Sequence, residues 1–328
     1  MGRRADSSPM PQLIKSRALG FAACALASSL WGCGFFFGKI ALVQMNVGAM
    51  VLYRFLFATL ALAPLLLLHR PRFSRADWGL LLLASFLGIP LQFLIQFSGL
   101  ALTTVSHASL MVGTMPVILA IGATLFAHER MDRTGWFALA VSTVGATLIA
   151  GSASHTTPAA ATAAHLGNPA PTLAGDLLVV LSLVIALAWI LINKSLMQRH
   201  SPITVTAYGI ACGAAMLLVC VPLLYPQPFG PPHLSAIALK VWLALAASGL
   251  LCTASTTLLW NWGLTQVPAS QAGVLLNMEP LIGSLLGVFL LREGLGPSAR
   301  TGGVLILAAA IVITTSSRTR SREQLPLT

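Results

Sequence analysis

Ten runs of apolar residues, each long enough to cross a lipid bilayer, follow one another along this chain. The hydrocarbon core of a bilayer is about 30 Å thick, and an α-helix that rises about 1.5 Å per residue needs about 20 residues to cross it. The runs occupy residues 18–40, 47–68, 77–101, 105–127, 134–151, 175–195, 202–224, 238–262, 270–291 and 299–317. The sequence therefore predicts an all-α polytopic membrane protein with ten transmembrane helices.

The distribution of charge supports this prediction and excludes a nucleic-acid-binding protein. Only 8% of the 328 residues are charged, whereas a soluble domain carries about 25%. The net charge of +11 would suit nucleic acid only if the 19 Lys and Arg residues gathered on one solvated face. They fall instead in short clusters between the apolar runs. With a cytoplasmic N-terminus, fourteen lie on the cytoplasmic side, four lie outside and Arg54 lies within a span. Because cytoplasmic loops are enriched in Lys and Arg, we expect both termini to be cytoplasmic.

The second half of the chain repeats the first. At an offset of 164 the alignment runs without a gap over 52 residues, and shorter offsets of 155 to 158 match the residues before it. The matched pairs include Trp78 with Trp242, Gly99 with Gly263, Pro116 with Pro280, Glu129 with Glu293, Tyr53 with Tyr208 and Trp31 with Trp189. Coincident Trp, Pro and Glu residues are not expected by chance in a Leu- and Ala-rich chain. The repeated unit therefore has five spans.

An odd number of spans per unit means that the two copies cross the membrane in opposite directions. Two inverted five-helix repeats related by an axis in the membrane plane are typical of secondary transporters, which bind substrate near the midplane where the repeats meet. The expected parts are a cytoplasmic basic tail at 1–17, a first repeat at 18–151, an external loop at 152–174, a second repeat at 175–317 and a cytoplasmic basic tail at 318–328.

Several short motifs resemble those of the EamA-type members of the drug/metabolite transporter superfamily. They are Leu30-Trp31-Gly32 with the following Lys39, Arg54 in the second span, Pro116 and Pro280, His128-Glu129-Arg130, and Arg292-Glu293, which Gly294 follows where the first repeat has Arg130. The resemblance covers residues 18–317. It implies a polytopic carrier of the bacterial inner membrane, often an exporter of amino acids, related metabolites or drugs, with a central cavity between its halves.

Glu279 is the acid expected nearest the membrane midplane. It lies about nine residues into the ninth predicted span, roughly 13 Å deep. Asn277 and Pro280 make this segment polar, and the missing N–H of Pro280 predicts a kink, as does Pro116 in the fourth span. Ionisable residues within a span are functional candidates. Glu279 is therefore a candidate for binding a substrate amine or carrying a proton; the alternative is a protonated carboxyl group bonded to a neighbouring helix.

Two further ionisable residues are candidates with open alternatives. Arg54 could bind an anionic group of the substrate, or contact a lipid phosphate or another helix. His107 could titrate near neutral pH as a coupling group, but the sequence identifies no carboxylate partner, which favours a structural role. Lys39 and Lys194, at the ends of predicted helices, are expected to anchor the protein at the membrane interface.

Neutral polar and aromatic residues complete the predicted substrate site. The amides of Gln92 and Gln96 lie one turn apart, and the repeat relates them to the segment that holds Trp260 and Asn261. These residues, together with Trp31, Trp189, Asn277 and Glu279, form the predicted substrate-binding set. Amide and aromatic groups in combination suit a small zwitterion or amphipathic molecule.

The leading hypothesis is a secondary carrier that exports a small organic metabolite by alternating access. The alternatives are an intramembrane enzyme, and a sensor or structural membrane protein without transport activity. The sequence contains no metalloprotease motif, catalytic triad or nucleotide-binding loop, and its five cysteines have no metal-ligand spacing, so we expect no enzymatic activity, metal or cofactor. Three G-x-x-x-G patterns indicate internal helix packing, and a homodimer stays open.

Overall fold

The computed structural model describes residues 10–68, 71–115, 117–118, 121–122, 133–152, 171–227, 229, 234–266 and 273–323. Helices make up all the regular structure in these ranges. In the first half they are α1 (Met10–Leu42), α2 (Val47–Leu68), α3 (Arg75–Phe86), the π-helix η1 (Leu87–Leu91), α4 (Gln92–Ala101), α5 (Val105–Val112) and α7 (Arg133–Ser152). In the second half they are α9 (Leu173–Met197), α10 (Pro202–Leu224), the 3₁₀-helix η2 (Leu234–Ala236), α11 (Leu239–Gly249), the π-helix η3 (Leu250–Ser255), α12 (Thr256–Gln266), the 3₁₀-helix η4 (Gly273–Asn277), α14 (Met278–Leu290) and α15 (Pro297–Glu323).

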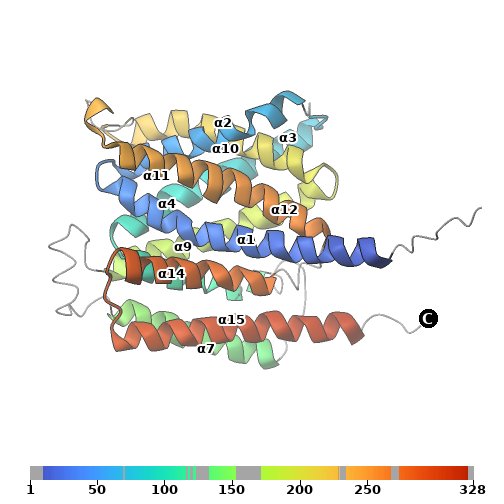
Figure 1. The fold of residues 1–328 in the computed structure, drawn as a ribbon, viewed down its shortest axis with the longest axis vertical. Coiled ribbons are helices and arrows are strands. Elements are labelled where there is room, and N and C mark those ends of the chain that lie inside the picture. Colours follow the sequence, from blue (N-terminus) through green and yellow to red (C-terminus); the bar gives the residue numbers. More distant parts are fainter. Residues whose placement is uncertain are drawn as a thin grey trace, which may run out of the picture.

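These helices confirm the predicted fold class of ten membrane-crossing helices in two inverted repeats. Six of them are long and apolar enough to span a bilayer by length and composition, and the described chain holds two shorter apolar helices, Trp136–Ile149 and Leu275–Leu290. The helices run roughly parallel to one another (Figure 1). The start of α1 and the end of α15 lie at the same end of the bundle, here called the tail end, and the opposite end is called the far end.

The third and eighth spans share a feature that hydropathy did not predict. Each is a long helix interrupted near its middle by a π-helical segment, η1 in the first repeat and η3 in the second. The offset of 164 places one on the other. Pro90 lies within η1, where its missing N–H favours an irregular turn. The corresponding residue of η3 is Ala254, so the second segment carries no such local indication.

The predicted ninth span is not one continuous α-helix. Its α-helical part, α14, begins only at Met278 and follows the 3₁₀-helix η4. Pro280 lies in the first turn of α14, where its missing N–H removes no intrahelical bond. The structure thus has a change of helix type beside Pro280, in place of the predicted kink within a longer helix. Pro116 and Glu129 lie outside the described residues.

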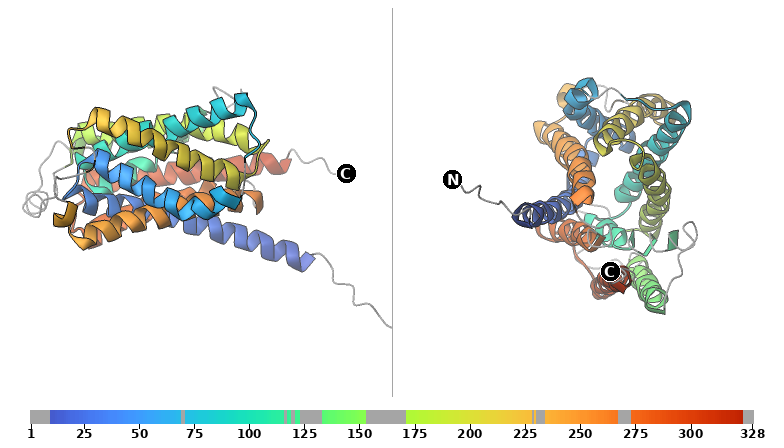
Figure 2. Two further views of the ribbon diagram at one scale, coloured as in Figure 1. Left: turned by 90° about the horizontal axis from the view of Figure 1, so that it is seen from above. Right: turned by 90° about the vertical axis from the view of Figure 1, so that its right-hand side faces the viewer.

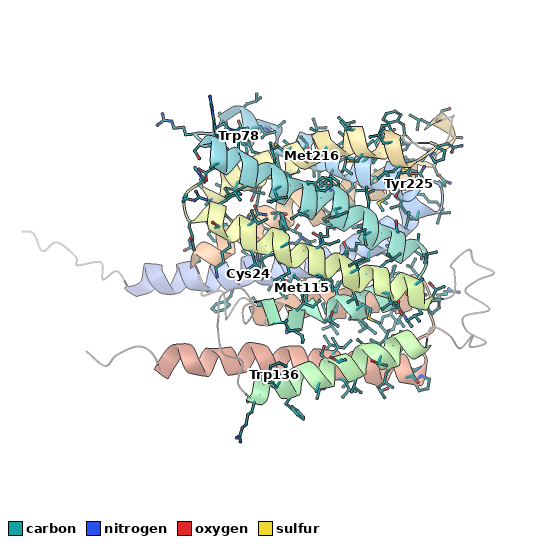
Figure 3. The ribbon with its side chains drawn as sticks, turned by 180° about the vertical axis from the view of Figure 1, so that it is seen from behind. Cys24, Trp78, Met115, Trp136, Met216 and Tyr225 are labelled. Carbon is teal, nitrogen blue, oxygen red and sulfur yellow. The ribbon has the colours of Figure 1, made fainter. Side chains whose placement is uncertain are left out.

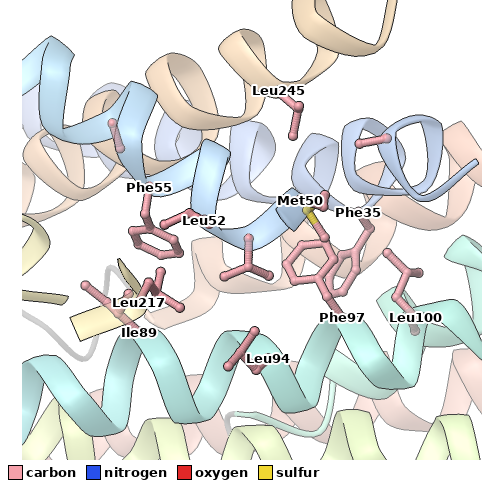
Figure 4. Close-up of a cluster of buried hydrophobic side chains, with 14 of the residues drawn as sticks. Phe35, Met50, Leu52, Phe55, Ile89, Leu94, Phe97, Leu100, Leu217 and Leu245 are labelled. Carbon is pink, nitrogen blue, oxygen red and sulfur yellow. The ribbon is translucent and has the colours of Figure 1, made fainter. Parts of the chain in front are cut away.

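The main hydrophobic core joins the two halves. Aromatic and aliphatic side chains from α1, α2, α4 and α10 meet there, including Phe35, Met50, Phe55, Phe97 and Leu217 (Figure 4). Helices α7 and α15 pack against each other at one edge of the bundle (Figure 2) and contribute Ile149 and Ile306 to this core. They approach closely at two glycines: a Cβ atom on Gly145 would lie 2.6 Å from the carbonyl oxygen of Gly302.

Candidate functional site

The guanidinium group of Arg54 lies inside the bundle, where helices of both repeats meet. The residue is only 3% exposed. Its Nε donates to Oγ1 of Thr253 at 2.8 Å and its Nη2 donates to the carbonyl oxygen of Cys252 at 3.2 Å, both in η3. Arg54 therefore makes the interhelix contact that was one of its predicted alternatives. The predicted contact with a lipid phosphate is wrong, because the guanidinium group is buried inside the bundle.

Two aromatic rings of α4 cover the same guanidinium group. Its central carbon lies 5.0 Å from the ring centre of Phe93 and 5.3 Å from that of Phe97. Cation–π attraction stabilises a positive charge in such a desolvated position by about 2 kcal/mol. A guanidinium group has five N–H donors. In the described chain, two of them donate to Thr253 and Cys252. The remaining donors leave capacity for an anionic group.

Glu279 lies against α1, the helix that also passes Arg54: a Cβ atom on Gly34 of α1 would lie 3.5 Å from Nη1 of Arg54. Glu279 is a first-turn residue of α14, where the helix dipole favours a negative charge, and its charge interacts with that of Arg54. Helix α1 passes close by at Gly32: a Cβ atom there would lie 2.5 Å from the carbonyl oxygen of Glu279 and 3.0 Å from the backbone nitrogen of Gly283. The glycine of the Trp31-Gly32 motif therefore permits the approach that brings α1 beside Glu279. Within the described chain, the Glu279 side chain has no hydrogen-bond partner.

The predicted aromatic residues divide into two places. The indole rings of Trp31 and Trp260 are 5.4 Å apart between their centres and tilted by 52°, so these two predicted site residues are together. Trp189 lies elsewhere, against η1, where the absence of a side chain on Gly88 leaves room for its ring.

The predicted amide residues also differ from one another. Gln96 is buried and Gln92 is partly buried in α4, the helix that carries Phe93 and Phe97. No described residue forms a hydrogen bond with either side chain. Asn261 instead donates from Nδ2 to Oγ1 of Thr206 at 2.6 Å, which ties α12 to α10. Asn277 is the residue at which η4 passes into α14.

His107 has a carboxylate partner that sequence reasoning missed. Its Nδ1 lies 3.2 Å from Oδ2 of Asp176, and both side chains are almost fully buried, at 3% and 1% exposure. Oδ1 of Asp176 accepts a hydrogen bond from the hydroxyl group of Thr103 at 2.7 Å. The two partners are 69 positions apart, and Asp176 follows the helix-capping Thr172 as an acid of the first turn of α9 commonly does. Nothing in the local sequence distinguished it.

Lys39 and Glu293 join the same buried cluster. The Lys39 ammonium group donates to the carbonyl oxygens of Leu100 and Thr103 at 2.8 and 2.6 Å, at the C-terminal end of α4. The expectation that Lys39 is an interface anchor is therefore wrong, because its charge satisfies a buried helix end. Glu293 accepts from the backbone N–H groups of Val105 and Ser106 at 2.8 and 2.7 Å. Glu293 thus caps the start of α5, which is far from Glu293 in the sequence. It does not cap α15, the helix that follows Glu293.

A group of His, Cys, Asp or Glu side chains large enough to hold a metal ion does not occur among the residues that the structure describes.

The chemical character of the Arg54 region is that of a binding site. It combines opposite charges, aromatic rings and amides without hydrogen-bond partners in the described chain. Such a site can bind a molecule that has charged and apolar parts.

Comparison with known proteins identifies what this arrangement is similar to. The family model described as the EamA-like transporter family matches residues 18–151 and 173–315. An uncharacterized transporter of Archaeoglobus fulgidus is 22% identical, over 88% of this chain and 95% of the relative. The inner membrane protein YtfF of Escherichia coli (strain K12) is 25% identical, over 92% of this chain and 95% of the relative.

A solved crystal structure also has the same fold. It superimposes with a TM-score of 0.61 at 17% sequence identity, and the match covers 94% of this chain and 99% of the other. At this identity the likeness extends to the fold alone.

Proposed function

Because the chain belongs to the EamA-like transporter family, and is a membrane transporter of the general class that its relatives are named for, we propose that it carries a small zwitterionic metabolite by alternating access. The substrate class is an amino acid or a related compound with an apolar or aromatic side chain. The proposed direction is export, and the proposed location is the inner membrane of a bacterium with the tail end in the cytoplasm. The family match favours transport over the enzyme and sensor alternatives.

The observation that carries this proposal is that Arg54 and Glu279, of opposite charge, both lie beside α1 where the repeats meet. The guanidinium group has more N–H donors than it has acceptors in the described part of the chain, and a carboxylate is the anion whose geometry it matches. The Glu279 carboxylate is an acceptor for an ammonium group. The rings of Trp31 and Trp260 supply apolar contact area. The site thus provides one binding group for each part of an apolar amino acid.

Flux measured in proteoliposomes tests this function. Purified full-length protein would be reconstituted and supplied with radiolabelled zwitterionic amino acids, and with two analogues of each, the decarboxylated amine and the deaminated acid. We expect saturable flux of at least one zwitterion and weaker flux of both analogues. Absence of flux for every compound, by protein that is folded and correctly inserted, would contradict the proposal.

Replacing Arg54 by Lys is expected to raise the KM for a carboxylate-bearing substrate by about tenfold or more, because losing one interaction of a buried charge costs upwards of about 2 kcal/mol. Lys retains the charge but has no planar fork to contact Thr253 and two aromatic rings simultaneously. The control is Arg300→Lys, at an exposed arginine that donates to the carbonyl oxygen of Leu295. An unchanged KM in Arg54→Lys would assign Arg54 to structure.

A further inference from the structure

Two tyrosine–tryptophan contacts join the two repeats, and neither belongs to the candidate substrate site. The ring centres of Tyr53 on α2 and Trp242 on α11 are 5.0 Å apart, with their planes at 77°. Those of Tyr208 on α10 and Trp78 on α3 are 6.1 Å apart, at 83°. In each contact the tyrosine comes from one repeat and the tryptophan from the other. Edge-to-face packing of this kind is a favourable arrangement of aromatic rings.

The two contacts are copies of each other under the internal repeat. Tyr53 corresponds to Tyr208 at an offset of 155, and Trp78 corresponds to Trp242 at an offset of 164. The hydroxyl groups follow the same pattern. Tyr53 donates to the carbonyl oxygen of Phe229, in the segment before α11, at 3.0 Å, and Tyr208 donates to that of Leu66, near the end of α2 and before α3, at 3.2 Å. Each tyrosine therefore contacts both a tryptophan and the segment that precedes the helix of that tryptophan.

Inversion of the repeats places these contacts at opposite ends of the bundle. Trp78 lies at the tail end, and Tyr225 lies at the far end (Figure 3). The ring of Tyr225 is close to Gly48 in the first turn of α2, so α2 begins at the far end. Tyr53 is five residues along α2 from Gly48, which puts the contact of Tyr53 with Trp242 in the far half of the molecule.

From this placement we infer that the two contacts are the opposing gates of the transport cycle, a role that rests on the proposed carrier function. The far gate consists of Tyr53 and Trp242, and the tail gate consists of Tyr208 and Trp78. Both are formed in this structure. Alternating access requires the repeats to separate at one end while they stay together at the other. Because each gate bridges the two repeats at one end, breaking one gate opens that end and leaves the other closed.

Among the described residues, the tail gate has an ionic part without a counterpart at the far gate. Asp77, next to Trp78, lies 2.6 Å from Nη1 of Arg199 and 3.0 Å from Nε2 of His200, in the turn between α9 and α10. The ring of Phe73 packs against both His200 and Trp78. At the far gate the position of Asp77 is taken by Val241. Arg199 corresponds to Gln44, a neutral residue whose side-chain oxygen accepts from the backbone N–H of Ala238 at 2.8 Å.

This difference favours a resting state that is closed at the tail end. Arg199 is 47% exposed, and an ion pair in that setting changes an equilibrium by up to about fivefold. The gates are therefore similar in strength, with a modest excess at the tail end. The substrate site would accordingly open more often toward the far end.

Hydrogen–deuterium exchange of the full-length protein in lipid nanodiscs, without substrate, tests the two gates. In Tyr53→Ala we expect exchange to rise in the first turns of α2 and α11 and to fall in the first turns of α3 and α10. In Tyr208→Ala we expect the reverse. Loss of one aromatic pair corresponds to a change of roughly two- to tenfold in the ratio of the two conformations. Asp77→Asn should act in the same direction as Tyr208→Ala, by up to about fivefold.

Three further variants separate gating from simple destabilisation. Tyr53→Phe and Tyr208→Phe keep the ring and lose only the hydroxyl bond, so each should produce a smaller change in the direction of its alanine variant. Trp136→Ala, at a tryptophan that is exposed on α7, should change neither end. Exchange that rises at both ends in either tyrosine variant, or that does not change at all, would overturn the inference. Since no substrate is present, opposite changes would support the gates even if the flux assay detected no transport.

Discussion

Glu279→Gln is expected to abolish substrate accumulation driven by a pH gradient, while the protein still folds and inserts. Gln has nearly the same size but cannot ionise or carry a proton. The charge of Glu279 interacts with that of Arg54, and among the described residues the Glu279 carboxylate forms no hydrogen bond. Losing the charge pair that Glu279 would form with the ammonium group of the substrate costs about 2–5 kcal/mol, which corresponds to roughly 30- to 5,000-fold in binding. Uptake by proteoliposomes at several imposed pH gradients measures the effect.

The repeat supplies a matched control for this experiment. The position that corresponds to Glu279 at the offset of 164 is Met115, which packs against the main core. Met115→Gln introduces the same amide in the other repeat and should leave the pH dependence of uptake unchanged. If Glu279→Gln retained the accumulation and pH dependence of the original protein, Glu279 would have a structural role only.

Asp176→Ala is expected to lower the free energy of unfolding by about 2–5 kcal/mol, because two buried hydrogen-bonding groups lose their acceptor at a cost of about 1–3 kcal/mol each. The substitution leaves the buried His107 ring and the Thr103 hydroxyl group without their acceptor. Thr103 also holds Lys39 through its carbonyl oxygen, so the loss affects the end of α4 as well. Equilibrium unfolding in mixed detergent micelles, followed by circular dichroism, measures the change.

Asp176→Asn is the control for this prediction. The amide oxygen still accepts a hydrogen bond from Thr103, so we expect a loss of only about 1–2 kcal/mol. Equal losses for the Ala and Asn variants would mean that the negative charge, rather than the hydrogen bonds, provides the stability. No loss in either variant would contradict the structural role assigned to Asp176.

The composition of the candidate site was predictable from the sequence, but its arrangement was not. Arg54 and Glu279 were found because ionisable residues are rare in membrane spans. The residues that surround them could not be predicted. Thr253, which accepts a hydrogen bond from Arg54, is 199 positions away in the sequence, and no local pattern relates the two residues. The same separation explains why His107 was assigned no partner and why Lys39 was expected at the membrane surface.

The π-helical segments show the same limit within a single element. Pro90 marks the irregular turn η1, whereas η3 contains no proline. Hydropathy is the same for a continuous α-helix and for one interrupted by a π turn, so only the structure distinguished them. The interruption matters because η3 supplies the two acceptors of Arg54.

The membrane class, the ten helices and the inverted five-helix repeats follow from the amino-acid sequence, because the length of apolar runs and the parity of spans can be counted along the chain. Tertiary structure alone decided which residues meet: Arg54 with η3 and two phenylalanines, His107 with Asp176, and each tyrosine with a tryptophan of the other repeat. The physical reason is that apolar surface turned toward lipid depends on composition, whereas a buried charge is stabilised by partners that only the packing of distant helices brings within reach.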